Sequence, residues 1–202
     1  MKRPPLIIAC TALLTACAGG GGTSAEDPAT ADSTLSVVGT VSRVEPPKEL
    51  EATIGDGTTM HNVELITDQM DTLYVEIENG SVAGGLAAGE RIDLLYRRSE
   101  DALIAIVAVN ISALQHLWTQ TRSTGGTQSI ELNAAGHAIT HNMQPADYQH
   151  WALQGGQLLL TCPPTPGVEQ SGYTDTFDIM LLTTDTLVIS NNHGQQVFWR
   201  EN

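Results

Sequence analysis

The clearest pattern along the chain is an alternation of apolar and polar residues in its second half. It predicts three short strands and the start of a fourth, at 129–133, 138–143, 148–153 and 157–161. Gly136 and the pair Gly155-Gly156 stand between these segments, where glycine lets the backbone reverse with a positive φ. Because the connections are short, we expect neighbouring strands to pair antiparallel as a meander.

Further strands are predicted on both sides of this meander. One contains Trp118, and the others lie at 173–182, 186–190 and 196–200. Asn191-Asn192-His193-Gly194 is a strong turn signal before the last of them. About eight short strands leave exposed edges unless the sheet closes on itself. An up-and-down β-barrel is therefore expected over residues 111–202.

The first half of the chain alternates as well and predicts five strands, at 36–44, 59–66, 72–78, 91–97 and 102–110. The last of these is the most continuously apolar and is expected to lie centrally. The Gly/Ala-rich connection 80–89 has room for one short turn of helix. Five strands in so short a segment predict, for 35–110, a small Greek-key barrel of the oligonucleotide/oligosaccharide-binding (OB) type, with a sandwich as the alternative. The predicted fold class is all-β.

Composition supports β structure and limits the partners. Aromatic residues are scarce, at 4%, whereas threonine, valine, leucine and glycine are plentiful, which favours strands over helices. The net charge of −14 opposes attraction to nucleic acid or to an anionic membrane surface, so no nucleic-acid partner is predicted. Tyr74 and Tyr96 are expected to be core or half-core rather than platforms for stacked bases. Arg97-Arg98 is interpreted as a solvated strand end.

The N-terminus predicts export and anchoring. Lys2 and Arg3 precede an apolar run over 6–16, which is too short for a membrane-spanning helix of about 20 residues and is typical of an export signal. Its end, Leu14-Thr15-Ala16-Cys17, resembles the lipobox of bacterial lipoproteins, in which the cysteine thiol carries diacylglycerol and becomes the first mature residue. The resemblance implies a signal peptide over 1–16 and lipidation of Cys17.

Residues 17–34 are rich in Gly, Ala, Thr, Ser and acidic residues and are predicted to be a flexible tether. Two or three acyl chains hold a protein firmly on a bilayer, at about 0.8 kcal/mol for each buried methylene. We expect the chain to be anchored through its N-terminal lipid in the cell envelope, at the outer membrane, with its domains in the periplasm or on the surface. Cys162 is left without a partner, so no disulfide is expected.

The second half also carries an ordered series of motifs: Trp118, Ile130-Glu131-Leu132-Asn133, Gly136, Ala138, Asn142-Met143, Tyr148, Trp151, Gly156, Leu158, Leu160 and Thr174-Asp175-Thr176. Over 114–202 this series resembles the lipocalin-like domain of bacterial cell-surface lipoproteins. The resemblance implies a β-barrel and no particular reaction. The chain departs from the family pattern two residues before the tryptophan, where His116 replaces a glycine that lets the backbone pack closely beneath the barrel.

Alternation predicts which side chains point into this barrel. The inward positions are Leu132, Ala138, Thr140, Trp151, Leu153, Leu158, Leu160, Phe177 and Ile179. Their default role is core packing, with Trp118 and Trp151 as plugs at the barrel end. The alternative is a shallow apolar site. The candidate ligand-binding residues for that site are Trp118, Leu132, Thr140, Trp151, Leu153 and Phe177.

The sequence lacks a recognisable catalytic arrangement. His137 and His141 lie four apart, which in a strand separates them by about 13 Å, too far to share a metal ion. His150 or His193 is able to approach either one across strands. No motif marks a histidine partner for Cys162, and no nucleophile elbow, phosphate loop or dinucleotide fingerprint is present. We therefore predict no catalytic residue, no metal and no cofactor.

The sequence predicts a non-enzymatic lipoprotein with four parts: signal peptide 1–16, tether 17–34, small β domain 35–110 and lipocalin-like barrel 111–202. The barrel is expected to be a binding or interaction module, with a small hydrophobic ligand or an envelope protein as partner. The alternative is a structural or envelope-stress-sensing protein with a filled barrel that binds a protein. A small hydrolase using a cross-strand His/Asp pair, with His141 or His193, is the remaining rival.

Overall fold

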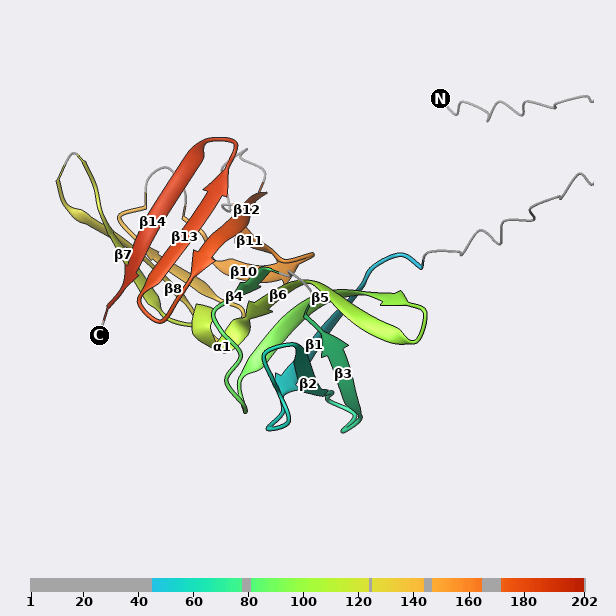
Figure 1. Cartoon of the computed structure of the whole chain (residues 1–202). Helices are drawn as coiled ribbons and strands as arrows, with labels where there is room; N and C mark the ends of the chain where they lie inside the picture. Colours follow the sequence, from blue (N-terminus) through green and yellow to red (C-terminus); the bar gives the residue numbers. More distant parts are fainter. Residues whose placement is uncertain (1–44, 78–80, 124, 144–146, 165–171, 202) are drawn as a thin grey trace, which may run out of the picture. The chain divides into compact units, whose positions relative to one another are not determined.

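The computed structural model describes residues 45–77, 81–123, 125–143, 147–164 and 172–201 (Figure 1). The expected signal peptide, the tether and the expected strand 36–44 lie outside the described residues. Nearly every described element is a strand, which confirms the all-β fold class. No helix among the described residues has the length and hydrophobicity needed to cross a membrane.

The first sheet closes into a small barrel. Its strands are β1 (Lys48–Ile54), β2 (Asn62–Ile66), β3 (Thr72–Glu76), β4 (Ser81–Ala83), β5 (Arg91–Ser99) and β6 (Ala102–Asn110). Their order is β3-β2-β1-β5-β6-β4, and β3 also pairs with β6 in parallel, which closes five of them into a ring. This Greek-key closure confirms the barrel and excludes the sandwich. β6 pairs with three strands, as its apolar sequence predicted.

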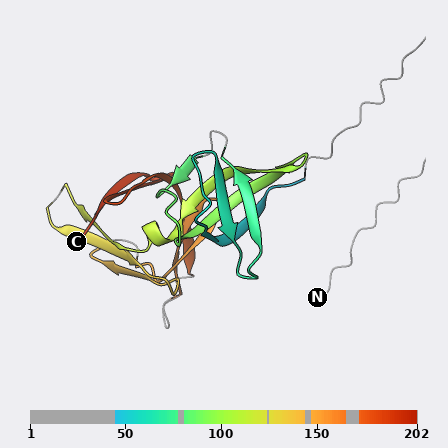
Figure 2. The same cartoon turned by 60° about the horizontal axis from the view of Figure 1, so that its bottom comes forward.

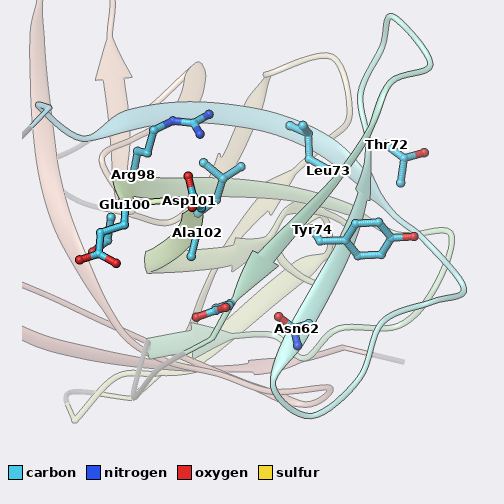
Figure 3. Close-up of a pocket in the computed structure, with 11 residues that line it drawn as sticks. Asn62, Thr72, Leu73, Tyr74, Arg98, Glu100, Asp101 and Ala102 are labelled. Carbon is cyan, nitrogen blue, oxygen red and sulfur yellow. The ribbon is translucent and has the colours of Figure 1, made fainter.

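Closure between β3 and β6 rests on one pair of residues, Glu76↔Ile104. On the N-terminal side of this pair the two strands separate, and a pocket opens beside them (Figure 3). The core beneath consists of alternating inward residues such as Val63, Val75 and Leu94, none more than 1% exposed. The pocket therefore lies at the edge of a well-packed core.

Two details of the first barrel were predicted wrongly. The first described strand, β1, was not predicted, although Leu50, Ala52 and Ile54 alternate with polar residues and the latter two are buried. The described part of the connection 80–89 contains the strand β4, which pairs with β6 in parallel, and no helical turn. The backbone of β4 therefore pairs with β6 and does not form the internal hydrogen bonds of a helical turn.

Tyr74 was also predicted wrongly. It is 61% exposed, because Leu73 and Val75 on either side of it take the inward positions of β3. Tyr96 is half-buried and packs against the core, as expected.

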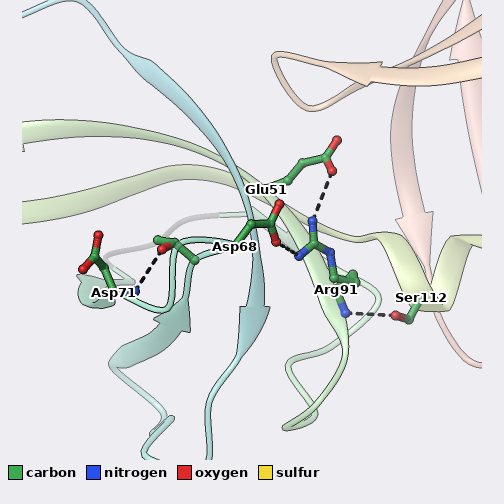
Figure 4. A network of polar contacts seen from close by, with 6 residues as sticks. Glu51, Asp68, Asp71, Arg91 and Ser112 are labelled. Atoms are coloured by element: carbon green, nitrogen blue, oxygen red, sulfur yellow. Dashed lines mark hydrogen bonds and ion pairs between the residues drawn. The ribbon is translucent and has the colours of Figure 1, made fainter.

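Arg91 at the start of β5 connects three segments of the first barrel (Figure 4). Its guanidinium lies 2.6 Å from Asp68 in the β2–β3 turn and 3.5 Å from Glu51 on β1. Its backbone N–H donates to the Ser112 hydroxyl at 2.9 Å. The hydrogen bond to Asp68 raises the pKa of Arg91 further. The side chains are largely exposed, so we attribute to these ion pairs a role in orientation rather than a large stabilisation.

The second sheet has eight strands: β7 (Leu117–Thr121), β8 (Thr127–Leu132), β9 (Ala138–His141), β10 (His150–Gln154), β11 (Gln157–Cys162), β12 (Tyr173–Leu182), β13 (Thr186–Asn191) and β14 (Gly194–Arg200). Each pairs antiparallel with its neighbour in the order β10-β11-β12-β13-β14-β7-β8-β9. All eight predicted strands are present, with ends shifted by a few residues. Figure 2 shows the same strands from a second direction.

The second barrel is nearly closed. The last strand, β14, pairs with the first, β7, through Trp199↔Thr119 and Arg200↔Trp118. Between β9 and β10 the described residues form one isolated bridge, His137↔His150. The described strands β7–β14 therefore form an up-and-down barrel with one weakly paired seam, between β9 and β10.

The link between the two sheets is the short helix α1 (Ile111–Leu114), which follows β6 directly. Buried Asn110 caps it by accepting a hydrogen bond from the Ala113 N–H at 2.9 Å. The Asn110 amide donates to the backbone oxygens of Gly84 and Gly85 and to Glu90. Both the amide nitrogen and the amide oxygen of this buried side chain are thereby used for structure.

Asp93 on β5 is the one buried carboxyl group with an orphan atom among the described residues. Its side chain is 2% exposed, and Oδ2 has no hydrogen-bond partner. Burial, reinforced by the nearby carboxylates of Glu49 and Glu51, raises the pKa of Asp93 to about 7. The folded protein therefore retains a proton on Asp93 that the unfolded chain releases at about pH 4.

This difference predicts a pH-dependent contribution to stability. Because the folded carboxyl has the higher pKa, its contribution is fully present below about pH 4, falls by about 1.4 kcal/mol per pH unit, and is lost by about pH 7. Asp93→Asn cannot ionise. Urea titrations at a series of pH values should therefore show that, across this window, the free energy of unfolding falls less steeply with pH for the variant than for the wild type.

Asp56→Asn, a change at an exposed turn residue, is the matched control and should leave the pH profile unchanged. Parallel profiles for wild type and Asp93→Asn would show that Asp93 is ionised in the folded protein.

Candidate ligand site in the eight-stranded barrel

The register of the second sheet identifies the side chains that face the barrel interior. Residues directly opposite each other in an antiparallel pair lie on the same face. Trp118 is opposite Ile130, and Ile130 is opposite Thr140. On the other side of the barrel Leu158 is opposite Phe177. These residues follow one another around the inner wall.

One end of the interior is filled with large apolar side chains. Trp118, Phe177 and Phe198 are at most 1% exposed and belong to one core cluster. The Trp118 indole N–H donates to the Leu114 carbonyl of α1 at 2.9 Å. Leu114 itself is fully buried. This end of the barrel is closed by the helix and the tryptophan together.

His116 occupies the position where the family pattern has glycine. Its ring meets Trp118 edge to face, with ring centroids 6.2 Å apart. Its backbone oxygen still accepts a hydrogen bond from the Leu132 N–H at 3.1 Å. Burial, together with the positive charge of Arg200, lowers the pKa of His116. A neutral imidazole therefore packs at this end of the barrel without breaking the backbone contact.

At the opposite end, the inner wall becomes polar. The inward positions there are Gln120, Gln128, Thr140 and Asp175, and each is only partly buried. Gln128 donates from its amide nitrogen to Gln120 and accepts from Arg122 Nε at 2.7 Å. We call this half-exposed polar end, defined by these four residues, the mouth of the barrel.

Tyr148 joins the filled end to the mouth. It is 5% exposed, and its ring packs edge to face on Phe177 with centroids 6.5 Å apart. Its hydroxyl donates to Asp175 Oδ2 at 2.5 Å. Burial, followed by the hydrogen bond to Asp175, raises the pKa of Tyr148. The phenol therefore remains protonated, and its one donor is held by Asp175 at the mouth.

Tyr173 and Cys162 lie opposite each other on the same inner wall. Both are partly buried and pack against the margin of the core cluster. Burial, with a smaller contribution from Cys162, raises the pKa of Tyr173. The two side chains extend the apolar wall to the level of the mouth.

The seam between β9 and β10 lies beside the mouth. The Ala138 N–H donates to the Gln149 oxygen at 3.0 Å, and the Trp151 N–H donates to the Gly136 oxygen at 2.9 Å. Further along β9, the Thr140 hydroxyl donates to Asp147 Oδ1 at 2.8 Å. Beyond the bridge, the described contact of β9 with the β10 side at Thr140 is this side-chain hydrogen bond.

The predicted ligand-binding residues fall into two groups. Trp118, Leu132 and Phe177 are fully buried in the filled end. Thr140 is part of the mouth, while Trp151 and Leu153 are half-buried on β10 at the edge of the core. The Trp151 indole N–H donates to the Asn133 carbonyl at 2.9 Å, which fixes this ring. Their role in binding remains a prediction.

Three of the four mouth residues, Gln120, Gln128 and Asp175, were not predicted as ligand-binding residues, and neither were the neighbouring Tyr148 and Tyr173. The signal was available in the alternation, because Tyr173 and Asp175 are in phase with Phe177 on β12.

The histidines do not assemble a metal site among the described residues. His150 approaches His137 across the seam, as expected, with ring centroids 5.5 Å apart. In the part of the chain that the structure describes, no three His, Cys, Asp or Glu side chains are placed to share a metal ion.

Comparisons with known proteins agree with the barrel assignment. A family model described as lipocalin-like matches residues 110–201. Among solved structures, a lipocalin-like protein from Bacteroides thetaiotaomicron is similar, with 26% identity and a TM-score of 0.38, over 44% of this chain and 97% of that chain. No curated protein matches the chain. The match of the family model to residues 110–201 thus supports the lipocalin-like resemblance inferred from the motifs.

Proposed function

We propose that the chain is a lipid-anchored envelope lipoprotein whose lipocalin-like barrel is a non-enzymatic binding module for a small hydrophobic ligand with a polar end. The observation that supports this most is the division of the barrel interior. Side chains are fully buried and apolar at one end, whereas the mouth is polar and only partly buried. A small molecule bound shallowly in the mouth would replace water against the apolar wall.

The arrangement of polar groups limits the chemistry of this ligand. Gln120 and Gln128 present amides, Tyr148 presents a hydroxyl, and Asp175 presents a carboxylate oxygen. These groups suit a ligand whose polar end both donates and accepts hydrogen bonds. The apolar body of the ligand would contact Trp151 and Leu153, with Trp118, Leu132 and Phe177 as the floor beneath.

A filled barrel that binds an envelope protein is the second candidate. It is favoured by an apolar row on the outer face, where Leu181 on β12, Val188 on β13 and Val197 on β14 lie opposite one another and Val188, at 7% exposed, is already covered. Trp199 on β14 is 52% exposed and Leu181 is 46% exposed. A protein partner would cover this row without using the barrel interior.

Filling the mouth tests the binding module. Thr140→Trp places a large ring at an inward position beside the seam, whereas Ile139→Trp places the same ring on the outer face of the same strand. In fluorescence titrations with the apolar probe N-phenylnaphthylamine, Thr140→Trp should weaken binding by at least about ten-fold. Ile139→Trp should bind like the wild type.

Thermal melting of both variants verifies that they are folded. Equal probe binding by both variants, or no saturable binding by the wild type, would contradict a ligand site in the mouth and favour the protein-binding alternative.

Changing Cys17 to serine tests the anchor. Serine cannot be acylated through a thiol, so Cys17→Ser should move from the membrane fraction to the soluble fraction of cells that express it. Cys162→Ser is the matched control because that cysteine lies within the barrel sheet, and it should stay with the membrane. Identical fractionation of Cys17→Ser and wild type would refute lipid anchoring.

A further inference from the structure

The first barrel leaves part of a sheet edge without a strand partner among the described residues. On one side β3 pairs with β2 along its whole length, whereas on the other side it pairs with β6 only through Glu76↔Ile104. The backbone of 72–75 therefore faces a pocket of about 660 Å³, and the β5–β6 hairpin forms the opposite wall (Figure 3). Unpaired N–H and C=O groups on such an edge are a template for another strand.

The side chains of β3 leave this edge accessible. The Tyr74 hydroxyl donates to Glu64 Oε1 on β2 at 2.8 Å, and Glu64 Oε2 accepts from the Gly57 N–H at 2.7 Å. In Figure 3 the Tyr74 ring accordingly points away from the hairpin. Leu73 and Leu103 pack against the core of the first barrel but are only partly buried. The pocket thus combines a backbone edge with two apolar side chains that a covering strand would bury.

The chain enters the first barrel at the end where this pocket opens. β1 runs antiparallel to β5 with Lys48 opposite Tyr96, so the residues before Lys48 lead towards the hairpin turn at 99–102. The hydrogen bond and the charge of Lys48 and, to a smaller extent, the charge of Arg98 lower the pKa of Glu45. Because Arg98 lines the pocket, the segment that precedes Glu45 starts close to the open end of the pocket.

The sequence before Glu45 suits such an edge. Residues 36–44, which read Ser-Val-Val-Gly-Thr-Val-Ser-Arg-Val, are rich in β-branched side chains and contain no acidic residue. Acidic residues outnumber basic ones on the rim of the pocket, where Arg98 stands against Glu76, Glu100 and Asp101. Arg43 therefore complements the charge of the rim.

We propose that the segment 37–41 docks in this pocket as an added strand of the first barrel, antiparallel to both β3 and β6. The direction follows from the entry point. The segment runs towards the open end of the pocket, whereas β3 and β6 both run away from it. Crossing the end of the hairpin from β1 to the far side of β6 spans two strand spacings, about 10 Å, which the three residues 42–44 can cover. Arg43 then passes the hairpin turn, where Glu100 and Asp101 lie.

The chain's own segment is favoured over a separate peptide. A strand from another protein would compete with a segment that its covalent link holds at roughly millimolar effective concentration. Docking does not depend on the lipid anchor. If the proposed anchor is present, docking shortens the free tether from residues 18–44 to residues 18–36 and holds the first barrel closer to the membrane.

Amide hydrogen exchange, followed by NMR on the full chain carrying Cys17→Ser, tests the docking without any contribution from the anchor. The amides of 72–75 that do not bond to β2 should be protected in this parent protein. Proline lacks the N–H of a paired strand, so Thr40→Pro should disrupt the added strand and speed the exchange of these amides by at least about ten-fold. Thr30→Pro makes the same change within the predicted tether and is the matched control, which should exchange like the parent.

The amide of Leu94, a fully buried residue of the barrel core, should exchange equally in all three proteins, which verifies that the variants are folded. Equal exchange at 72–75 in all three proteins would overturn the proposal. Faster exchange at 50–52 in place of 72–75 would also overturn it and assign the segment to β1, which pairs with β2 only at Thr53 and Ile54. Protection at 72–75 that rises with protein concentration would overturn docking within one chain and identify a second copy as the occupant.

Discussion

The closure of two β-sheets is the constraint on which the rest of this structure depends. An open sheet edge leaves backbone N–H and C=O groups unpaired, and a barrel pairs them. The first sheet closes through a single parallel pair, Glu76↔Ile104, and the second through β14–β7 together with the bridge His137↔His150. Both candidate sites lie beside the weakest of these contacts. Where few strand pairs form, the wall opens and side chains become accessible.

How the interior is filled explains the difference between the two ends of the lipocalin-like barrel. Three of the nine Phe, Trp and Tyr side chains of the chain, Trp118, Phe177 and Phe198, are fully buried in one core cluster at one end. They fill that end completely. Towards the mouth the inward positions carry amide, hydroxyl and carboxyl groups, which water or a polar ligand can satisfy. The proposed ligand site is therefore restricted to the mouth.

Much of the fold could be predicted from the sequence because a two-residue period is a local property. The eight strands of the second barrel and four strands of the first follow from it. β1 was missed because the apolar residues Leu50, Ala52 and Ile54 are separated by Glu51 and Thr53 and follow two prolines. Tyr74 was assigned to the core or half-core from its place in an alternating strand, but it is out of phase with the inward residues Leu73 and Val75. The phase was the better guide.

The sites were harder to predict, because they depend on contacts between distant segments. Nothing in the local sequence shows that Tyr148 reaches Asp175, or that Glu64 receives hydrogen bonds from both Tyr74 and Gly57. These contacts require the register of whole strands. The pocket beside β3 likewise exists only because β3 and β6 pair at one position.

The most direct test of a ligand in the lipocalin-like barrel is native mass spectrometry of the Cys17→Ser protein, purified without detergent and then extracted with solvent. The account predicts a near-stoichiometric excess mass and an extractable hydrophobic molecule with one polar end. A bare protein mass, under conditions that preserve a weak reference complex, would contradict it.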